Sequence, residues 1–218
     1  MKVGELIQRF RLTADDAEGR VFWTDEELVG YLNDAVQEAC ERAKLIQDRM
    51  ILSVTPGQQA CELHPSVFAV ERVTLAGRPL DETDTEELDC SRPGWETRTG
   101  QPRCFVFEQA NAAPAAQLRL VPMPHQPMQL VATVYRGALV PLSLANLDAE
   151  PEINARLHPH LLHWMHHSAF QKLDAEVFDA GRSASSLVLF EQAFGQRPDA
   201  NVQRKQRERR AHVVRFRW

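Results

Sequence analysis

The chain has 218 residues, of which 44% are hydrophobic and 25% charged, the composition of a globular protein with room for one or two domains. No apolar run approaches the roughly 20 residues of a membrane span, and the first ten residues lack a signal-peptide core, so we expect synthesis in the cytosol. The net charge is −5, but the segment from Arg197 onward holds eight basic and two acidic side chains, a charge of +6, which leaves −11 on residues 1–196.

A short helix is predicted at residues 2–12, where apolar side chains recur on one side. A longer helix is predicted from Thr24, because Thr24 and Glu27 have the spacing of a capping box. Trp23 and Leu28 stand at the two positions of a hydrophobic staple, which fixes the entry of the chain into the helix. A buried apolar stripe follows at three- and four-residue spacing, and it includes Leu28, Leu32, Ala35, Val36, Ala39, Ala43 and Ile46. We interpret this segment as a packing helix, with Asn33 and other polar residues facing outward.

Residues 49–141 have the alternation typical of strands. The first strands flank the Pro56–Gly57 turn, and a second pair is predicted around Gly77 and Arg78. The acidic stretch 81–89 is expected to be a surface turn or short helix, and three more strands follow it. We therefore predict a small all-β sandwich or barrel here.

Helical signals return after residue 141. Pro159 suits the first turn of a helix, and a row of apolar residues at four-residue spacing runs from Leu157 through Leu173 to Val177. Asp179 can cap a last helix, and Gly195 can end it as a left-handed residue. The apolar face of that helix is expected to hold Leu187, Val188, Phe190 and Phe194.

The order helices, strands, helices predicts an α+β fold. We expect a helical bundle formed by both ends of the chain with an inserted all-β domain and an extended C-terminal arm. The predicted parts are the first helical part at 1–48, the β domain at 49–141, the second helical part at 142–196 and the basic arm at 197–218.

The stretch "HPHLLHWMHH" carries five histidines, and His163 and His167 have the i,i+4 spacing that can chelate a metal. No glutamate of an H-E-x-x-H motif lies between them, so we favour polar-face or interface residues over a metal site.

The four cysteines, at 40, 61, 90 and 104, form no C-x-x-C pair, which indicates free and mostly buried thiols. Phosphate-binding loops and nucleophile elbows lack their motifs. We expect no enzyme activity, no metal and no cofactor.

The end of the chain, "QRKQRERRAHVVRFRW", combines basic side chains with alternating apolar ones. Basic residues alone would suit nucleic-acid phosphates, whereas the terminal aromatics favour an arm that orders on a protein partner. The residues assigned to this docking arm are Arg204, Lys205, Arg207, Arg209, Arg210, Val213, Arg215, Phe216, Arg217 and Trp218.

Several stretches in this order resemble the head-to-tail adaptor (connector) proteins of short-tailed phages, the group of tail tubular protein A. They are "FWTDEELVGYLNDAVQEACERAKLI", Trp95 with "TGQPRCFVF" after it, "LRLVPMP", "VYRG" and "LFEQAFGQRPDA". The resemblance implies a structural virion protein that forms a ring, typically of twelve copies, beneath the portal. Such a ring joins the capsid to the tail and extends the DNA channel.

The resemblance also implies partners and a location. The partners are the portal protein, neighbouring copies, tail nozzle or tail fibre proteins, and DNA that passes without specific binding; no membrane is involved. The location is the tail at the portal vertex of the virion, and the host cytoplasm during assembly. Packing between subunits is expected to use Trp23, Leu28, Tyr31, Leu32 and Val36.

Two other interpretations remain open. One is a DNA-binding or packaging-associated virion protein whose basic tail grips the genome. The other is a metal-dependent hydrolase that uses the histidines.

Overall fold

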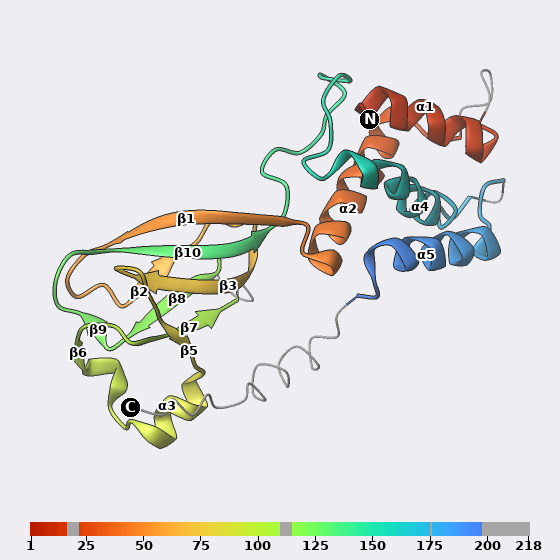
Figure 1. The fold of residues 1–218 in the computed structure, drawn as a ribbon. Coiled ribbons are helices and arrows are strands. Elements are labelled where there is room, and N and C mark those ends of the chain that lie inside the picture. The colour runs from red at the N-terminus through yellow and green to blue at the C-terminus, as the bar shows by residue number, and fades with distance from the viewer. Residues whose placement is uncertain (17–21, 110–114, 175, 198–218) are drawn as a thin grey trace.

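The structure is a computed structural model that describes residues 1–16, 22–109, 115–174 and 176–197. The fold is mixed α+β, which confirms the predicted class, and the described residues include five α-helices. In Figure 1 the helices other than α3 lie together at one end of the molecule, and the strands form the other end.

The elements alternate along the chain from helices to strands and back to helices. The helices are α1 (Val3–Ala14), α2 (Asp25–Ala43), α3 (Thr85–Ser91), α4 (His158–Ala169) and α5 (Ala180–Phe194), with 3-10 turns η1 (Trp95–Thr97) and η2 (Ala155–Leu157). The strands are β1 (Ile46–Val54), β2 (Ala60–Glu62), β3 (Val67–Leu75), β4 (Arg78–Pro79), β5 (Asp81–Glu82), β6 (Thr99–Gly100), β7 (Cys104–Glu108), β8 (Gln117–Val121), β9 (Met123–Pro124) and β10 (Met128–Arg136).

Helices from the two ends of the chain share one hydrophobic core. Helix α4 is central and packs against α1, α2 and α5. Trp23, only 1% exposed, meets Phe10 and Phe170 edge to face, with ring centroids 5.4 and 5.7 Å away. Edge-to-face pairs of this kind add to the stabilisation that burial of the rings provides. The aromatic side chains therefore join segments that are far apart in the sequence.

The start of α2 confirms the predicted capping box. The Thr24 hydroxyl accepts a hydrogen bond from the Glu27 backbone at 3.2 Å, and the Glu27 carboxylate accepts one from the Thr24 backbone at 2.8 Å. Both staple residues, Trp23 and Leu28, are buried in the helical core. The Lys172 ammonium also reaches the Glu27 carboxylate at 2.7 Å, which ties this cap to the segment after α4.

The last two helices differ from the prediction in three places. Helix α4 ends at Ala169, and Leu173 of the predicted row is 93% exposed. Val188 is 51% exposed because it lies about 100° around the helix from Leu187 and off the stripe of Phe190 and Phe194. Gly195 has φ 87° and ψ 167°, which is an extended glycine conformation outside the predicted left-handed helical region. The Asp179 cap is confirmed, since its carboxylate accepts from the Arg182 backbone at 2.9 Å.

Within the described residues, the strands form two four-stranded sheets and a two-stranded one. The four-stranded sheets have the orders β1-β10-β3-β4 and β2-β8-β7-β5. The long strands β1 and β10 pair antiparallel from Ile46 opposite Arg136 to Val54 opposite Met128. β3 and β4 form the predicted pair, joined by a turn in which Gly77 has φ 78°.

The two larger sheets share a second apolar cluster, to which Val73 and Ala132 contribute from one sheet and Phe105 and Leu118 from the other. Residues 49–141 are mostly strands but not all-β, because α3 and η1 also lie in this segment. Helix α3 overlaps the acidic stretch 81–89, for which a surface turn or short helix was predicted. Asp84 caps α3, with its carboxylate 2.6 Å from the Glu87 backbone nitrogen. Leu88 of α3 and Trp95 of η1 belong to a small third cluster with Cys104, Val106 and Val121.

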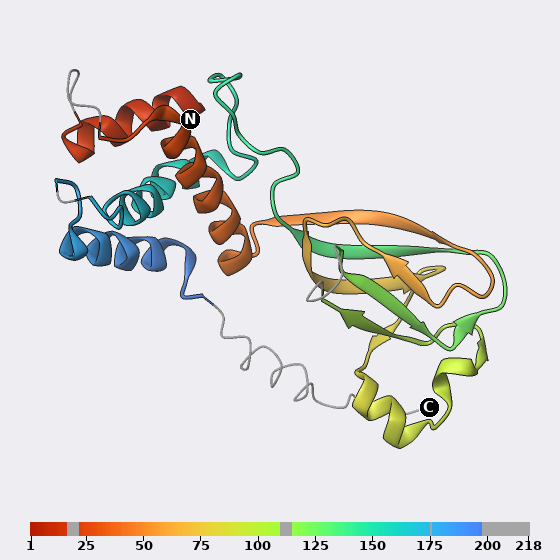
Figure 2. The same ribbon diagram turned by 180° about the vertical axis from the view of Figure 1, so that it is seen from behind.

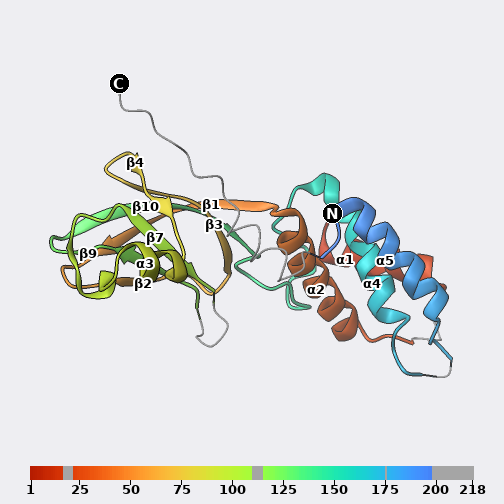
Figure 3. The same ribbon diagram turned by 90° about the horizontal axis from the view of Figure 1, so that it is seen from below.

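Two chain crossings join the helical part to the strands, and both are visible from the two sides in Figures 1 and 2. Strand β1 follows α2 almost directly, and the chain that leaves β10 runs back beside α2 to the start of α1. The view in Figure 3 shows the same separation of strands from helices. The strands begin at Ile46 and end at Arg136, close to the predicted limits of 49 and 141. That the two parts are separate domains stays a prediction.

Candidate functional site

Residues 137–154, here called the return segment, connect β10 to η2 and run beside α2 to the start of α1 (Figure 1). The backbone nitrogens of Val3 and Gly4, at the start of α1, donate to the carbonyls of Ala149 and Leu147 at 2.9 and 3.0 Å. These bonds satisfy donors that the first turn of a helix leaves without partners inside the helix. The return segment is therefore part of the helical end of the fold although it contains no regular helix.

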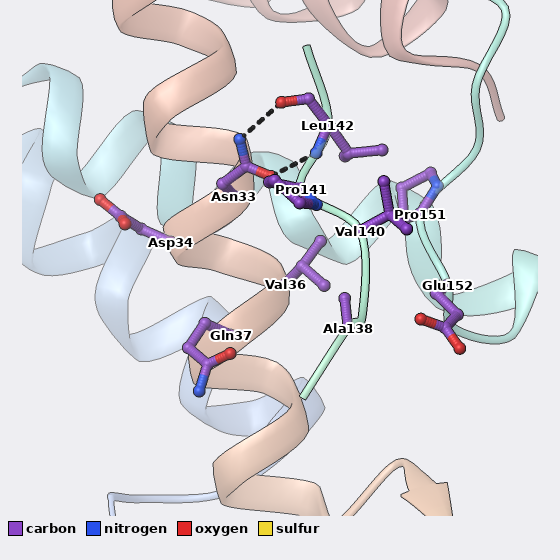
Figure 4. Close-up of a pocket in the computed structure, with 10 residues that line it drawn as sticks. All are labelled: Asn33, Asp34, Val36, Gln37, Ala138, Val140, Pro141, Leu142, Pro151 and Glu152. Atoms are coloured by element: carbon purple, nitrogen blue, oxygen red, sulfur yellow. Dashed lines mark hydrogen bonds between the residues drawn. The ribbon is translucent and has the colours of Figure 1, made fainter. Parts of the chain in front are cut away.

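Asn33 of α2 clamps the middle of the return segment. Its side-chain nitrogen donates to the Leu142 carbonyl at 2.9 Å, and its side-chain oxygen accepts from the Leu142 backbone nitrogen at 2.8 Å (Figure 4). The sequence predicted an outward-facing Asn33, whereas the structure gives both ends of its amide a partner. Below this clamp lies a hollow between α2 and the return segment, lined by Asn33, Asp34, Val36, Gln37, Ala138, Val140, Pro141, Leu142, Pro151 and Glu152.

Arg136, the last residue of β10, ties the strands to the return segment. Its guanidinium bonds Asp48 of β1 at 2.8 Å and Glu152 at 2.7 Å, and it also donates to the Gly137 carbonyl. Glu152 in addition accepts from the Leu139 backbone nitrogen at 2.9 Å. Hydrogen bonding to the Arg136 guanidinium lowers the pKa of both carboxyl groups. The start of the return segment thus has a fixed path.

Arg42 of α2 fixes α5 on the other side of the helical core. Its side chain is 5% exposed, and it pairs with Glu38 at 2.9 Å and with Glu191 of α5 at 3.6 Å. The guanidinium also lies 5.2 Å from the ring centroid of Trp164 and 5.3 Å from that of Phe190. A planar cation suits such a site because it stacks on rings while its edges bond carboxylates.

Ser183 and His167 make a second connection between α4 and α5. The Ser183 hydroxyl lies 3.0 Å from the His167 carbonyl and 2.9 Å from its Nδ1. Arg182 stacks over Phe170 with its guanidinium carbon 4.5 Å from the ring centroid. These contacts hold the buried face of α5 against α4 and turn its opposite face to solvent.

The five histidines do different things. His158 is buried; its Nδ1 accepts from the N-terminal ammonium of Met1 and its Nε2 donates to the Ile153 carbonyl. His160 is exposed beside Phe194. Burial lowers the pKa of His163, with a smaller contribution from His160. His166 is stacked between two aromatic rings, and His167 bonds Ser183 within the same chain. His158, His166 and His167 thus make contacts within the chain, whereas His160 lies at the surface.

The described residues contain no metal-ligand cluster, and their four cysteines are free. No group of three His, Cys, Asp or Glu side chains that could hold a metal ion occurs among them. Cys40, Cys61 and Cys104 are buried and free, and Cys90 is free and exposed, as predicted. Burial raises the pKa of the Cys40 thiol to about 12, so it is not poised as a nucleophile. None of the helices in the described part has the length and apolar character to cross a bilayer.

The residues predicted for packing between subunits lie mostly inside a single chain. Trp23, Leu28, Leu32 and Val36 are at most 4% exposed and belong to the helical core. Their burial is therefore satisfied within one chain, and their role in packing between subunits stays a prediction. Tyr31 is partly exposed, and its predicted role stays a prediction.

The predicted docking arm, from Arg204 to Trp218, lies outside the described residues. The chain approaches it along α2, where the Gly195 carbonyl is 3.4 Å from the Arg42 guanidinium and the Arg197 guanidinium is 3.6 Å from Glu38. Arg197, the first residue of the predicted basic arm 197–218, therefore lies beside an acidic side chain of α2.

Sequence reasoning missed the exposed apolar side chains of the helical end. On the return segment these are Leu139, Val140 and Leu147, and on α5 they are Val188 and Leu189. The one available signal was the scarcity of charged residues from 180 to 190, where only Arg182 is charged.

The model of the family described as SU10 adaptor protein matches residues 1–215, almost the whole chain. The comparison with curated proteins found none that matches.

Proposed function

The chain belongs to the SU10 adaptor protein family and is thus a phage structural adaptor, and we propose that it forms a ring beneath the portal that joins capsid to tail. The observation that carries this proposal is the family match over residues 1–215. The predicted subtype is the tail tubular protein A-like adaptor, with twelve copies in the ring. The partners are the portal, neighbouring copies, and tail nozzle or tail fibre proteins.

The side chains of the described residues support a structural role. A catalytic site usually brings acids, bases or metal ligands together. The described residues hold no group of three side chains that could bind a metal ion. The strongly bonded side chains, Asn33, Arg42 and Arg136, instead hold segments of the chain together. We therefore propose that the protein is not an enzyme and uses no cofactor.

The charge distribution supports a role at a DNA channel. Residues 1–196 carry −11, and like charge disfavours binding of phosphates, so DNA could pass along this body without adhering. We propose that the basic arm docks on the portal, with Phe216 and Trp218 as its apolar anchors. Several arms in one ring would bind with avidity even if each were weak.

The experiment that tests this proposal is attachment to tailless, portal-bearing heads. The full chain should co-sediment with heads that carry portal and should not bind heads that lack it. The second candidate function, a DNA-binding or packaging-associated protein, is favoured only by the charge of +6 from Arg197 onward. This alternative predicts instead that the protein binds bare duplex DNA and that its affinity falls steeply as the salt concentration rises.

A further inference from the structure

The outward face of α5 is unusual for a helix at a protein surface. Such helices normally turn charged and polar residues to water. The exposed residues of α5 are instead Ala180, Gly181, Arg182, Ala184, Ser185, Val188, Leu189 and Gln192. The one charged member, Arg182, is drawn over Phe170, and Val188 and Leu189 are 51% and 45% exposed.

The return segment presents a second apolar surface. Val140 is 74% exposed and lines the hollow beneath the Asn33 clamp (Figure 4), and Leu139, the residue before it, is 47% exposed. The surface is fixed in advance by the bonds of Asn33 to Leu142 and of Glu152 to Leu139. A preformed surface loses little conformational freedom on binding, so apolar contact there translates more fully into affinity.

The two surfaces lie at opposite ends of the helical part. Helix α4 packs with α1 on one side and α5 on the other, and the return segment is bonded to the start of α1. Figure 1 shows the return segment and α5 on opposite sides of α2. Two different surfaces on opposite ends of one subunit are what a head-to-tail contact requires, because each copy must offer one surface to each neighbour.

We propose that the outward face of α5 of one copy packs on the return segment of the next, with Val188 and Leu189 against Val140 and the hollow beside it. This inference rests on the proposed ring and names the contact that would build it. The occupant of the hollow is then a second copy of this chain. The exposed residues of α5 include one basic side chain, Arg182, and no acidic one, whereas the lining of the hollow includes Asp34 and Glu152 and no basic one, so the charges of the two surfaces are complementary.

Cysteine cross-linking tests the contact directly. The experiment uses a Cys90→Ser background, which removes the exposed native thiol. The double variant Val140→Cys with Val188→Cys is oxidised in two samples. One is the chain after incubation with portal-bearing tailless heads, and the other is the concentrated purified chain. The expected result is a ladder of multiples beyond the dimer, while each single variant stays monomeric. The matched control pairs Val188→Cys with Ile51→Cys, which is 67% exposed on β1, and should give no ladder.

Charge substitutions give an independent readout. Val188→Glu and Val140→Glu each alter one exposed side chain, so the fold should be retained, and each should weaken association by about tenfold or more because a charge would be buried unpaired. A mixture of the two variants retains one intact junction and should give heterodimers and nothing longer.

The outcomes separate the contact from the proposed function. Chains that bind heads but give no ladder, or a ladder equally strong in the Ile51 control, overturn the contact and leave the adaptor role standing. A specific ladder in a chain that does not bind heads supports the contact and counts against the adaptor role. Absence of both ladder and heterodimers overturns the contact as well.

Discussion

The side-chain amide of Asn33 is bonded at both ends to the backbone of Leu142, 109 positions away. This pair holds the return segment against α2 and shapes the hollow beside it (Figure 4).

Asn33→Asp should loosen this contact. The carboxylate can still accept from the Leu142 nitrogen, but it cannot donate to the Leu142 carbonyl and would repel it. We expect a loss of about 1–3 kcal/mol in the free energy of unfolding, measured by urea denaturation. The adjacent Asp34→Asn, at an exposed position, should change stability by less than about 0.5 kcal/mol. Equal effects of the two variants would show that the clamp adds nothing.

Arg42→Lys should destabilise the seating of α5 although it keeps the positive charge. A lysine cannot stack its plane on Trp164 and Phe190 while bonding both Glu38 and Glu191. We expect a loss of about 1–2 kcal/mol in the free energy of unfolding, in the range typical of a single disruptive substitution. Arg9→Lys on the exposed face of α1 is the matched control and should be neutral; a neutral Arg42→Lys would refute the stacking argument.

His166 should make stability fall in mild acid. Burial lowers its pKa to about 4, with smaller contributions from the charges of His163 and Arg182. Its Nε2 lies 2.8 Å from the Thr13 hydroxyl, and its buried Nδ1 has no hydrogen-bond partner among the described residues. The unfolded chain takes up this proton near pH 6.5, before the folded chain does. This contribution to stability is therefore complete above about pH 6.5 and is lost as the pH falls toward about 4.

Urea denaturation at several pH values measures this effect. Between pH 7 and pH 5 the His166 contribution should cost about 2 kcal/mol, and His166→Gln should remove most of that pH dependence. His160→Gln, at an exposed position, should leave it unchanged. An unaltered pH dependence in His166→Gln would mean that other groups cause it.

Deletion of residues 201–218 should leave the folded body intact and abolish attachment to the portal. Within the arm, Phe216→Ala and Trp218→Ala should weaken attachment more than any single Arg→Ala. Burial of an aromatic side chain is worth roughly 2–3 kcal/mol, whereas an exposed ion pair is typically worth less than about 1 kcal/mol. Co-sedimentation with tailless heads measures attachment. Dominant arginine effects, with salt-dependent binding to duplex DNA, would favour the DNA-binding alternative.

The local features of this fold were predictable because their causes are local. The capping box of Thr24 and Glu27, the cap of Asp179 and the turn at Gly77 each depend on residues within a few positions. The helical stripe likewise identified Leu28 and Leu32 as buried residues.

Features that depend on distant partners were not predictable. The spacing around Asn33 places it on the polar side of α2, and nothing nearby indicates Leu142 as its partner. The row ending at Leu173 and Val177 continues the helical period, so the end of α4 at Ala169 has no sequence signal. The stripe of α2 also cannot distinguish burial against α4 of the same chain from burial against a neighbouring copy. The prediction that Trp23, Leu28, Leu32 and Val36 contact a neighbouring copy rests on this ambiguity.

Electron microscopy of the purified chain, alone and mixed with portal-bearing tailless heads, tests the central claim most directly. The proposed ring adaptor predicts monomers or small oligomers of the chain alone, and one closed ring, with twelve copies expected, beneath the portal of each head. Protein distributed along released DNA, or heads with portal that acquire no ring, would contradict the claim.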